Sequence, residues 1–135
     1  MTMKKKEIIK FFSWFSIIVG IFHFILETWF HFRFEQSIIQ LFCDYIGISL
    51  LIFAGIIVLK NINGKGLLCG AWGYSFCLNY RAFAWRMDEF IAKTSSNSTD
   101  NTLIILSFTL FFSFIAFIYS LIICYPNENK QKNTI

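Results

Sequence analysis

The chain has 135 residues, which is enough for a single domain. Hydrophobic residues make up 56% of it and charged residues 15%, against about 45–50% and about 25% in soluble proteins, so the composition excludes an ordinary soluble domain. The net charge of +4 does not indicate nucleic-acid binding, because Lys4, Lys5, Lys6 and Lys10 lie directly before an apolar run, as in a membrane-surface anchor. We therefore expect an integral membrane protein whose surroundings are the lipid bilayer and which has no nucleic-acid partner.

Four apolar stretches are long enough to cross about 30 Å of hydrocarbon as helices. They cover residues 11–32, 38–59, 66–86 and 102–125. Glu27, Asp44 and Arg81 lie inside the first three, and the fourth contains no charged residue. The first stretch has no small-residue cleavage site after it, so we interpret it as a retained span. The sequence predicts an all-α fold: a transmembrane four-helix bundle that forms one integral membrane domain over residues 1–135.

The charges beside these spans predict the orientation of the chain. One side carries eight basic residues, Lys4, Lys5, Lys6, Lys10, Lys60, Lys65, Lys130 and Lys132, and the other carries Arg33, Arg86 and Lys93. Because basic residues are retained on the cytoplasmic side, we expect a multi-pass cell-membrane protein with both termini in the cytoplasm. Asn63-Gly64 indicates a turn in the short connection between the second and third spans.

Small and polar residues occupy one arc of each span, given a rotation of about 100° per residue. In the third span this arc contains Gly66, Gly70, Gly73, Tyr74, Cys77 and Arg81. We expect these stripes to face one another and the Phe, Ile and Leu residues to face lipid. Gly66 and Gly70 form a small-xxx-small pair that favours close helix contact, within the chain or in a homo-oligomer or with a membrane partner.

The ionisable side chains are predicted to converge in the outer half of the bundle, together with a few polar neighbours. This polar cluster consists of His23, Glu27, His31, Asp44, Asn79, Tyr80 and Arg81. An isolated buried charge is costly, and a guanidinium stays protonated. We therefore expect Arg81 to point inward and to pair with Asp44, Glu27 or both, with His23 and His31 as outer hydrogen-bond partners.

The spacing His23-x-x-x-Glu27-x-x-x-His31 has three interpretations: a structural hydrogen-bonded cluster, a ligand, proton or substrate site, or a metal site. The two histidines are about 12 Å apart along a helix axis, so one ion could hardly bind both, and we predict no metal. Glu27 and Asp44 could act as paired acid and base, or could share Arg81. No nucleotide-binding or cofactor motif is present, so the sequence assigns neither a cofactor nor a catalytic residue.

The layout resembles the DoxX-like group of small four-helix bacterial membrane proteins. The similarity rests on the length, the four spans, Ile18-Val19-Gly20 in the first span and the run from Gly47 to Gly55 in the second. This resemblance implies a compact four-helix bundle in a group with redox-linked or envelope roles. It assigns no functional residue.

Taken together, these features predict a membrane protein that binds a small molecule, a lipid or a partner in a polar pocket. Two other functions stay open. One is a membrane enzyme that acts on a lipid or quinone, with Glu27, Asp44 or His23 as acid or base. The other is a transporter that works as an oligomer, since four spans alone would form only a narrow pore. A pocket closed toward the cytoplasm would argue against transport.

Overall fold

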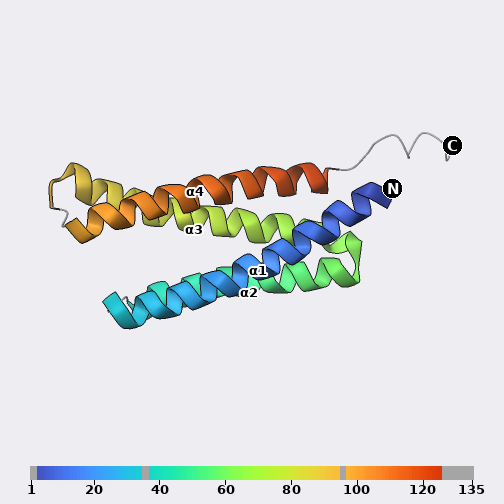
Figure 1. Ribbon diagram of the computed structural model, residues 1–135, viewed down its shortest axis with the longest axis horizontal. Coiled ribbons are helices and arrows are strands. Elements are labelled where there is room, and N and C mark those ends of the chain that lie inside the picture. Colours follow the sequence, from blue (N-terminus) through green and yellow to red (C-terminus); the bar gives the residue numbers. More distant parts are fainter. Residues whose placement is uncertain (1–2, 35–36, 95–96, 126–135) are drawn as a thin grey trace.

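A computed structural model describes residues 3–34, 37–94 and 97–125, and nearly all of these residues are helical (Figure 1). The helices are α1 (Met3–Phe34), α2 (Ile38–Lys60), α3 (Lys65–Ile91) and α4 (Asn97–Cys124), with a short 3-10 helix, η1 (Ile62–Gly64), between α2 and α3. The prediction of an all-α fold is therefore confirmed. Glu35, Lys130 and Lys132 lie outside the described residues.

Three of the described helices are long and apolar enough to cross a membrane. They are α1 over Lys4–Arg33, α2 over Ile38–Lys60 and α4 over Asn101–Cys124. The third predicted span is a helix, but α3 does not belong to this group, and it contains Lys65, Arg81, Arg86, Asp88 and Glu89. Composition therefore supports membrane crossing for α1, α2 and α4, but not by itself for α3.

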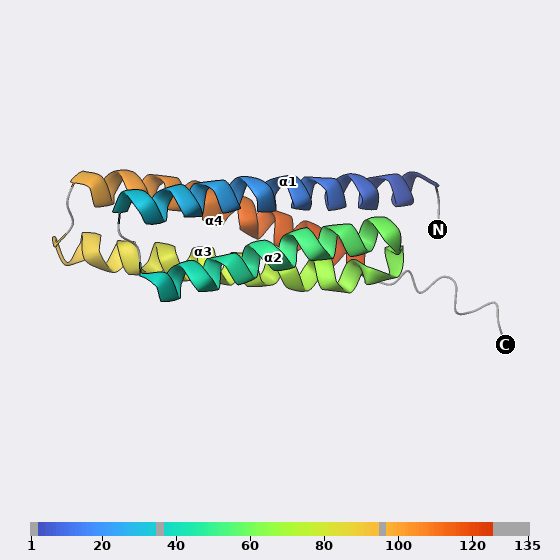
Figure 2. The same ribbon diagram turned by 90° about the horizontal axis from the view of Figure 1, so that it is seen from below.

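Successive helices run in opposite directions, so the start of α1 and the end of α4 lie at the same end of the molecule (Figures 1 and 2). Helix α1 packs on α2, α3 packs on α4, and α2 packs on α3. The turn between α2 and α3 forms where Asn63-Gly64 predicted it, and the Asn61 side chain accepts a hydrogen bond from the Asn63 backbone N–H at 3.1 Å. Lys4, Lys5, Lys6, Lys10, Lys60 and Lys65 all belong to this end, which we call the basic end.

Two glycines bring α1 and α2 into close contact. A Cβ added to Gly55 would lie 2.6 Å from Cγ1 of Ile17 and 2.8 Å from the carbonyl oxygen of Ser13. A Cβ added to Gly20 would lie 2.7 Å from Cγ1 of Ile52. These two helices can approach this closely only because neither position carries a side chain.

The predicted orientation of α3 is wrong. Its buried residues are Leu68, Ala71, Trp72 and Ser75, whereas Gly66, Gly70, Cys77 and Arg81 are exposed. Nothing lies within 4 Å of a Cβ added to Gly66 or Gly70. Arg81 is nine residues after Trp72, a rotation of about 180°, so a helix that buries Trp72 turns Arg81 to the opposite face.

The core lies in the half of the molecule next to the basic end. Its buried residues fall within residues 9–20 of α1, 47–58 of α2, 68–75 of α3 and 113–123 of α4. No residue in 21–46 or 76–112 is buried among those whose side chains the structure describes. The helix pairs α1–α2 and α3–α4 also diverge away from the basic end (Figure 1). We call this less packed half the open half.

Candidate functional site

A cavity of about 410 Å³ lies at the boundary between the core and the open half. Its volume falls within the range of about 300–1,000 Å³ that is typical of small-molecule sites. All four helices contribute to its wall, which consists of Val19, His23, Leu51, Trp72, Ser75, Asn79, Phe108, Thr109, Phe111, Phe112 and Ser113. The wall is thus mostly apolar, with a few neutral polar groups and one histidine.

Aromatic rings close the cavity toward the basic end. Trp72 stacks on Phe12 and Phe15 with centroid separations of 5.8 and 6.1 Å, and Phe15 contacts Phe112 at 5.7 Å. The indole Nε1–H of Trp72 donates a hydrogen bond of 2.9 Å to Oγ of Ser16. Trp72 is only 1% exposed, so its indole is buried between the helices at this end of the cavity.

The wall contributed by α4 reaches the molecular surface. Phe108 and Phe111 line the cavity and are also 72% and 66% exposed. A molecule dissolved in surrounding lipid would therefore contact the cavity first at Phe108 and Phe111. A second, apolar pocket of about 310 Å³ lies between α3 and α4 and is lined by Phe76, Tyr80, Phe83, Ser107, Leu110, Phe111 and Phe114.

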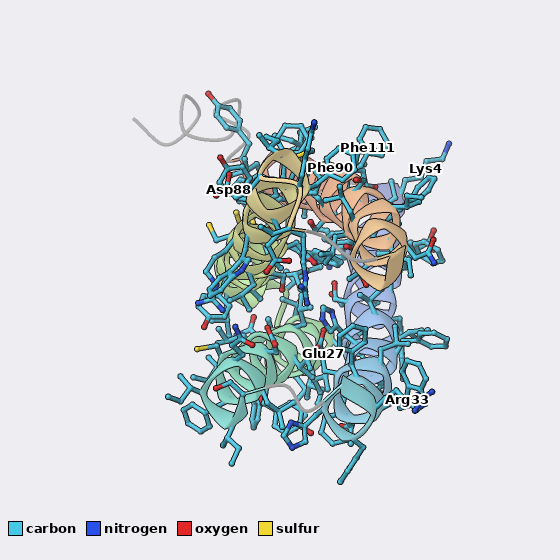
Figure 3. The ribbon with its side chains drawn as sticks, turned by 90° about the vertical axis from the view of Figure 1, so that its left-hand side faces the viewer. Lys4, Glu27, Arg33, Asp88, Phe90 and Phe111 are labelled. Atoms are coloured by element: carbon cyan, nitrogen blue, oxygen red, sulfur yellow. The ribbon has the colours of Figure 1, made fainter. Side chains whose placement is uncertain are left out.

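His23 and Glu27 form a hydrogen-bonded pair on the wall contributed by α1. His23 Nε2 lies 3.1 Å from Glu27 Oε1, one helical turn further along, and both side chains are half-buried. Glu27 faces the space between the helices, whereas Arg33 and Asp88 point away from it (Figure 3). When Glu27 is ionised it can only accept, so Nε2 of His23 donates this hydrogen bond, and in the neutral form of the imidazole Nδ1 is then an acceptor. Nδ1 of His23 has no hydrogen-bond partner within the described residues.

Ser75 and Asn79 face the cavity from α3, one helical turn apart. The Asn79 side-chain amide donates a hydrogen bond of 3.0 Å to the carbonyl oxygen of Ser75. Ser75 is only 6% exposed, yet its hydroxyl forms no hydrogen bond to any described residue. Thr109 and Ser113 line the same cavity, but their hydroxyls donate to Leu106 and Leu110 carbonyl oxygens, each at 3.0 Å. Free hydrogen-bonding capacity is therefore concentrated on Ser75, Asn79 and His23.

The structure assembles the predicted polar cluster only in part. Of its members, His23 and Asn79 line the cavity, and Glu27 is hydrogen-bonded to His23. Asp44 and His31 are half-buried and do not line it, and the buried Nδ1 of His31 has no hydrogen-bond partner among the described residues. Tyr80 lines the second pocket instead.

The predicted pairing of Arg81 is wrong. Within the described residues, Arg81 is exposed and forms no ion pair, and Glu27 pairs with His23 instead. The orientation of α3 explains this, because the face that carries Arg81 is turned away from the other helices.

The second ion pair of the described residues lies near the end of α3. Arg86 donates to Glu89 Oε2 at 2.8 Å, and Trp85 donates to Oε1 at 2.9 Å. The hydrogen bond from Arg86, helped by that from Trp85, holds the pKa of Glu89 below its usual value near 4.5. This interaction therefore stabilises the fold above that value and is lost as the pH falls through the lowered pKa.

Only His23 and Asn79 of the cavity wall belong to the predicted cluster, and Ser75 and Trp72 are among the site residues that the sequence analysis did not identify. Both lie on the same helical arc as Leu68, Ala71 and Asn79, a spacing that marks one face of a helix. The glycine stripe on the other face masks this signal, because small residues favour helix contacts. In the part of the chain that the structure describes, no three His, Cys, Asp or Glu side chains are grouped as a metal site would require.

Comparison with known proteins adds no assignment: no protein-family model, no curated protein and no solved structure matches the chain. The resemblance to the DoxX-like group therefore stays a prediction.

Proposed function

We propose that this protein is a four-helix transmembrane bundle that binds a small molecule in the cavity of its open half. The observation that carries the proposal is the combination of an apolar wall with three groups that retain free hydrogen-bonding capacity, His23, Ser75 and Asn79. A mostly apolar wall with a few polar groups that can still form hydrogen bonds is typical of a small-molecule site.

The direction of the helices supports a membrane span for α3 as well. Helix α2 ends at the basic end and α4 begins at the opposite end, so α3 runs the full length between them (Figure 1). If α1, α2 and α4 cross a bilayer, α3 crosses it beside them. Its charged residues from Arg81 to Glu89 then lie toward the membrane surface, where long side chains reach water.

The proposed orientation in the cell membrane has the basic end in the cytoplasm. Lys4, Lys5, Lys6, Lys10, Lys60 and Lys65 gather there, and cytoplasmic loops carry an excess of lysine and arginine. Both termini are then cytoplasmic, and the cavity lies in the outer half of the bundle. The burial of Trp72 at this end of the cavity favours binding over transport.

A single-tryptophan variant tests cavity binding. Trp14, Trp29 and Trp85 are replaced by phenylalanine, which leaves Trp72 as the only indole, and the protein is placed in lipid nanodiscs. Brominated dodecyl compounds with alcohol, carboxylate or ammonium heads are then added as collisional quenchers. Because Trp72 is 1% exposed, bulk lipid does not reach it, and saturable quenching reports entry into the cavity.

The matched pair Asn79→Phe and Tyr80→Phe serves as the control. A phenyl ring at position 79 fills the cavity and is expected to abolish saturable quenching, whereas Tyr80 lies outside the cavity wall and its replacement should leave the quenching unchanged. If none of the brominated compounds quenches Trp72 saturably, the proposed function is wrong.

A membrane enzyme is the second candidate, and the His23–Glu27 hydrogen bond of 3.1 Å favours it. A carboxylate that holds an imidazole by Nε2 leaves Nδ1 free to accept a proton from a bound molecule. This candidate requires chemical turnover of the molecule that enters the cavity. Recovery of an added compound unchanged after incubation would favour binding alone.

A further inference from the structure

The hydrogen-bonding groups of the cavity define the chemistry of its ligand. We propose that the cavity takes an uncharged, single-chain amphiphile with a hydroxyl head: the hydroxyl binds among His23, Ser75 and Asn79, and the apolar chain lies along the aromatic wall. This inference rests on the proposed binding function and adds the class of ligand to it.

No charged side chain lines the cavity, and this disfavours a charged head. Glu27 is the nearest acidic group on α1, and its Oε1 is already engaged by His23 Nε2. A carboxylate or phosphate would meet no cation in the cavity wall, and an ammonium would meet no free anion there. Transfer of an uncompensated charge to such a site is far more costly than transfer of a neutral group.

The three free groups include both donors and acceptors. Ser75 has a hydroxyl that can donate and accept, Asn79 has a free carbonyl oxygen and a second N–H, and His23 has an accepting Nδ1. A hydroxyl can donate to the imidazole and accept from the serine or the amide at once. An ether or a ketone lacks the donor and would leave His23 Nδ1 unsatisfied.

The apolar part of the cavity wall can bind the hydrocarbon chain of the proposed ligand. Val19, Leu51, Trp72 and Phe112 surround the remaining space, and Phe108 extends it to the surface of α4. The hydrocarbon chain of a ligand can therefore enter sideways from the lipid, past α4, without passing Trp72. One cavity of about 410 Å³ suits one chain and leaves no room for a second chain of similar length.

Quenching of Trp72 in the single-tryptophan protein tests this ligand class. Four probes share one brominated dodecyl chain and differ in the head: alcohol, methyl ether, carboxylate and ammonium. We expect the alcohol to bind at least about tenfold more tightly than the other three, since one hydrogen bond to a neutral group corresponds to about a tenfold change in affinity. Equal or tighter binding of the ether, the carboxylate or the ammonium would overturn the hydroxyl assignment while leaving the binding function intact.

Variants of the polar groups complete the test. Ser75→Ala should weaken binding of the alcohol by about tenfold and leave binding of the ether unchanged. Thr109→Val is the matched control, because Thr109 lines the same cavity but its hydroxyl already donates within α4. If Thr109→Val weakens alcohol binding as much as Ser75→Ala does, hydrogen bonding by Ser75 is not the cause. Absence of saturable quenching by all four probes would instead overturn the binding function itself.

Discussion

Serine residues of the core differ in what their hydroxyls do. Ser13 and Ser16 donate to carbonyl oxygens one turn earlier in α1, at 2.8 Å in both cases, so their polarity is satisfied within their own helix. Ser16 has a second role, because its oxygen also accepts the indole proton of Trp72 from α3. Ser75 has no such partner among the described residues, and this difference separates the site from the core.

The Trp72–Ser16 hydrogen bond gives a prediction at the scale of single residues. Ser16→Ala leaves a buried indole N–H without an acceptor and should lower the free energy of unfolding by about 1–3 kcal/mol. Ser13→Ala is the matched control: Ser13 is equally buried but bonds only within its helix, so its loss should be less than about 1 kcal/mol. Unfolding in detergent micelles, titrated with dodecyl sulfate, measures both. Equal losses for the two variants would contradict a structural role for the interhelical bond.

Glycines on different helices meet opposite environments. Gly55 of α2 lies against the backbone of α1, whereas Gly70 of α3 faces open space. Gly66-x-x-x-Gly70 has the spacing that favours helix contact, yet neither of these glycines meets a neighbour, whereas Gly55 packs closely without that spacing. The exposed Gly66 and Gly70 of α3 are thus not part of the packing of the single chain.

Alanine substitutions at these glycines give a prediction at the scale of helices. Gly55→Ala places a methyl group 2.8 Å from a backbone carbonyl oxygen that cannot rotate away, and should lower the free energy of unfolding by about 1–3 kcal/mol. Gly70→Ala should change it by no more than about 0.5 kcal/mol, as for other surface substitutions. The same detergent titration applies. A larger loss at Gly70 than at Gly55 would mean that α3 contacts something other than its own chain.

At the scale of the whole molecule, the two ends of the helix bundle differ both in packing and in charge. The core and six lysines share the basic end, the cavity lies at the boundary with the open half, and the exposed Arg81 and Asp88 belong to the open half. A membrane protein arranged in this way binds its ligand away from the cytoplasm if its lysines are cytoplasmic. The proposed topology therefore determines which side of the membrane the cavity serves.

Cysteine labelling in intact cells tests this topology. In a background with the four native cysteines replaced by alanine, Thr94→Cys should react with a membrane-impermeant maleimide. Asn63→Cys should react only after the membrane is permeabilised, because the exposed Asn63 lies at the basic end. Identical labelling of the two sites would show that α3 does not cross the membrane, and the reverse pattern would invert the orientation.

The sequence by itself determined that the protein is helical, where each helix lies, where the chain turns and that the lysines gather at one end. These properties depend on local composition and on the turn residues Asn63 and Gly64. It also placed His23 and Glu27 one turn apart, so their pairing could be expected from α1 alone. Only the tertiary structure decided the rotation of α3, and with it the exposure of Arg81 and the roles of Ser75 and Asn79.

The rotation of α3 could not be predicted from the sequence because a helix in a membrane has apolar surroundings on every side. Lipid chains are as apolar as leucine, so hydrophobicity alone does not decide which face of α3 turns inward. The glycine face and the face of Leu68, Ala71 and Trp72 were both plausible contacts in the sequence. Packing of Trp72 against Phe12 and Phe15, together with its hydrogen bond to Ser16, selects the second face. Those partners are more than fifty residues away along the chain, beyond the reach of any local pattern.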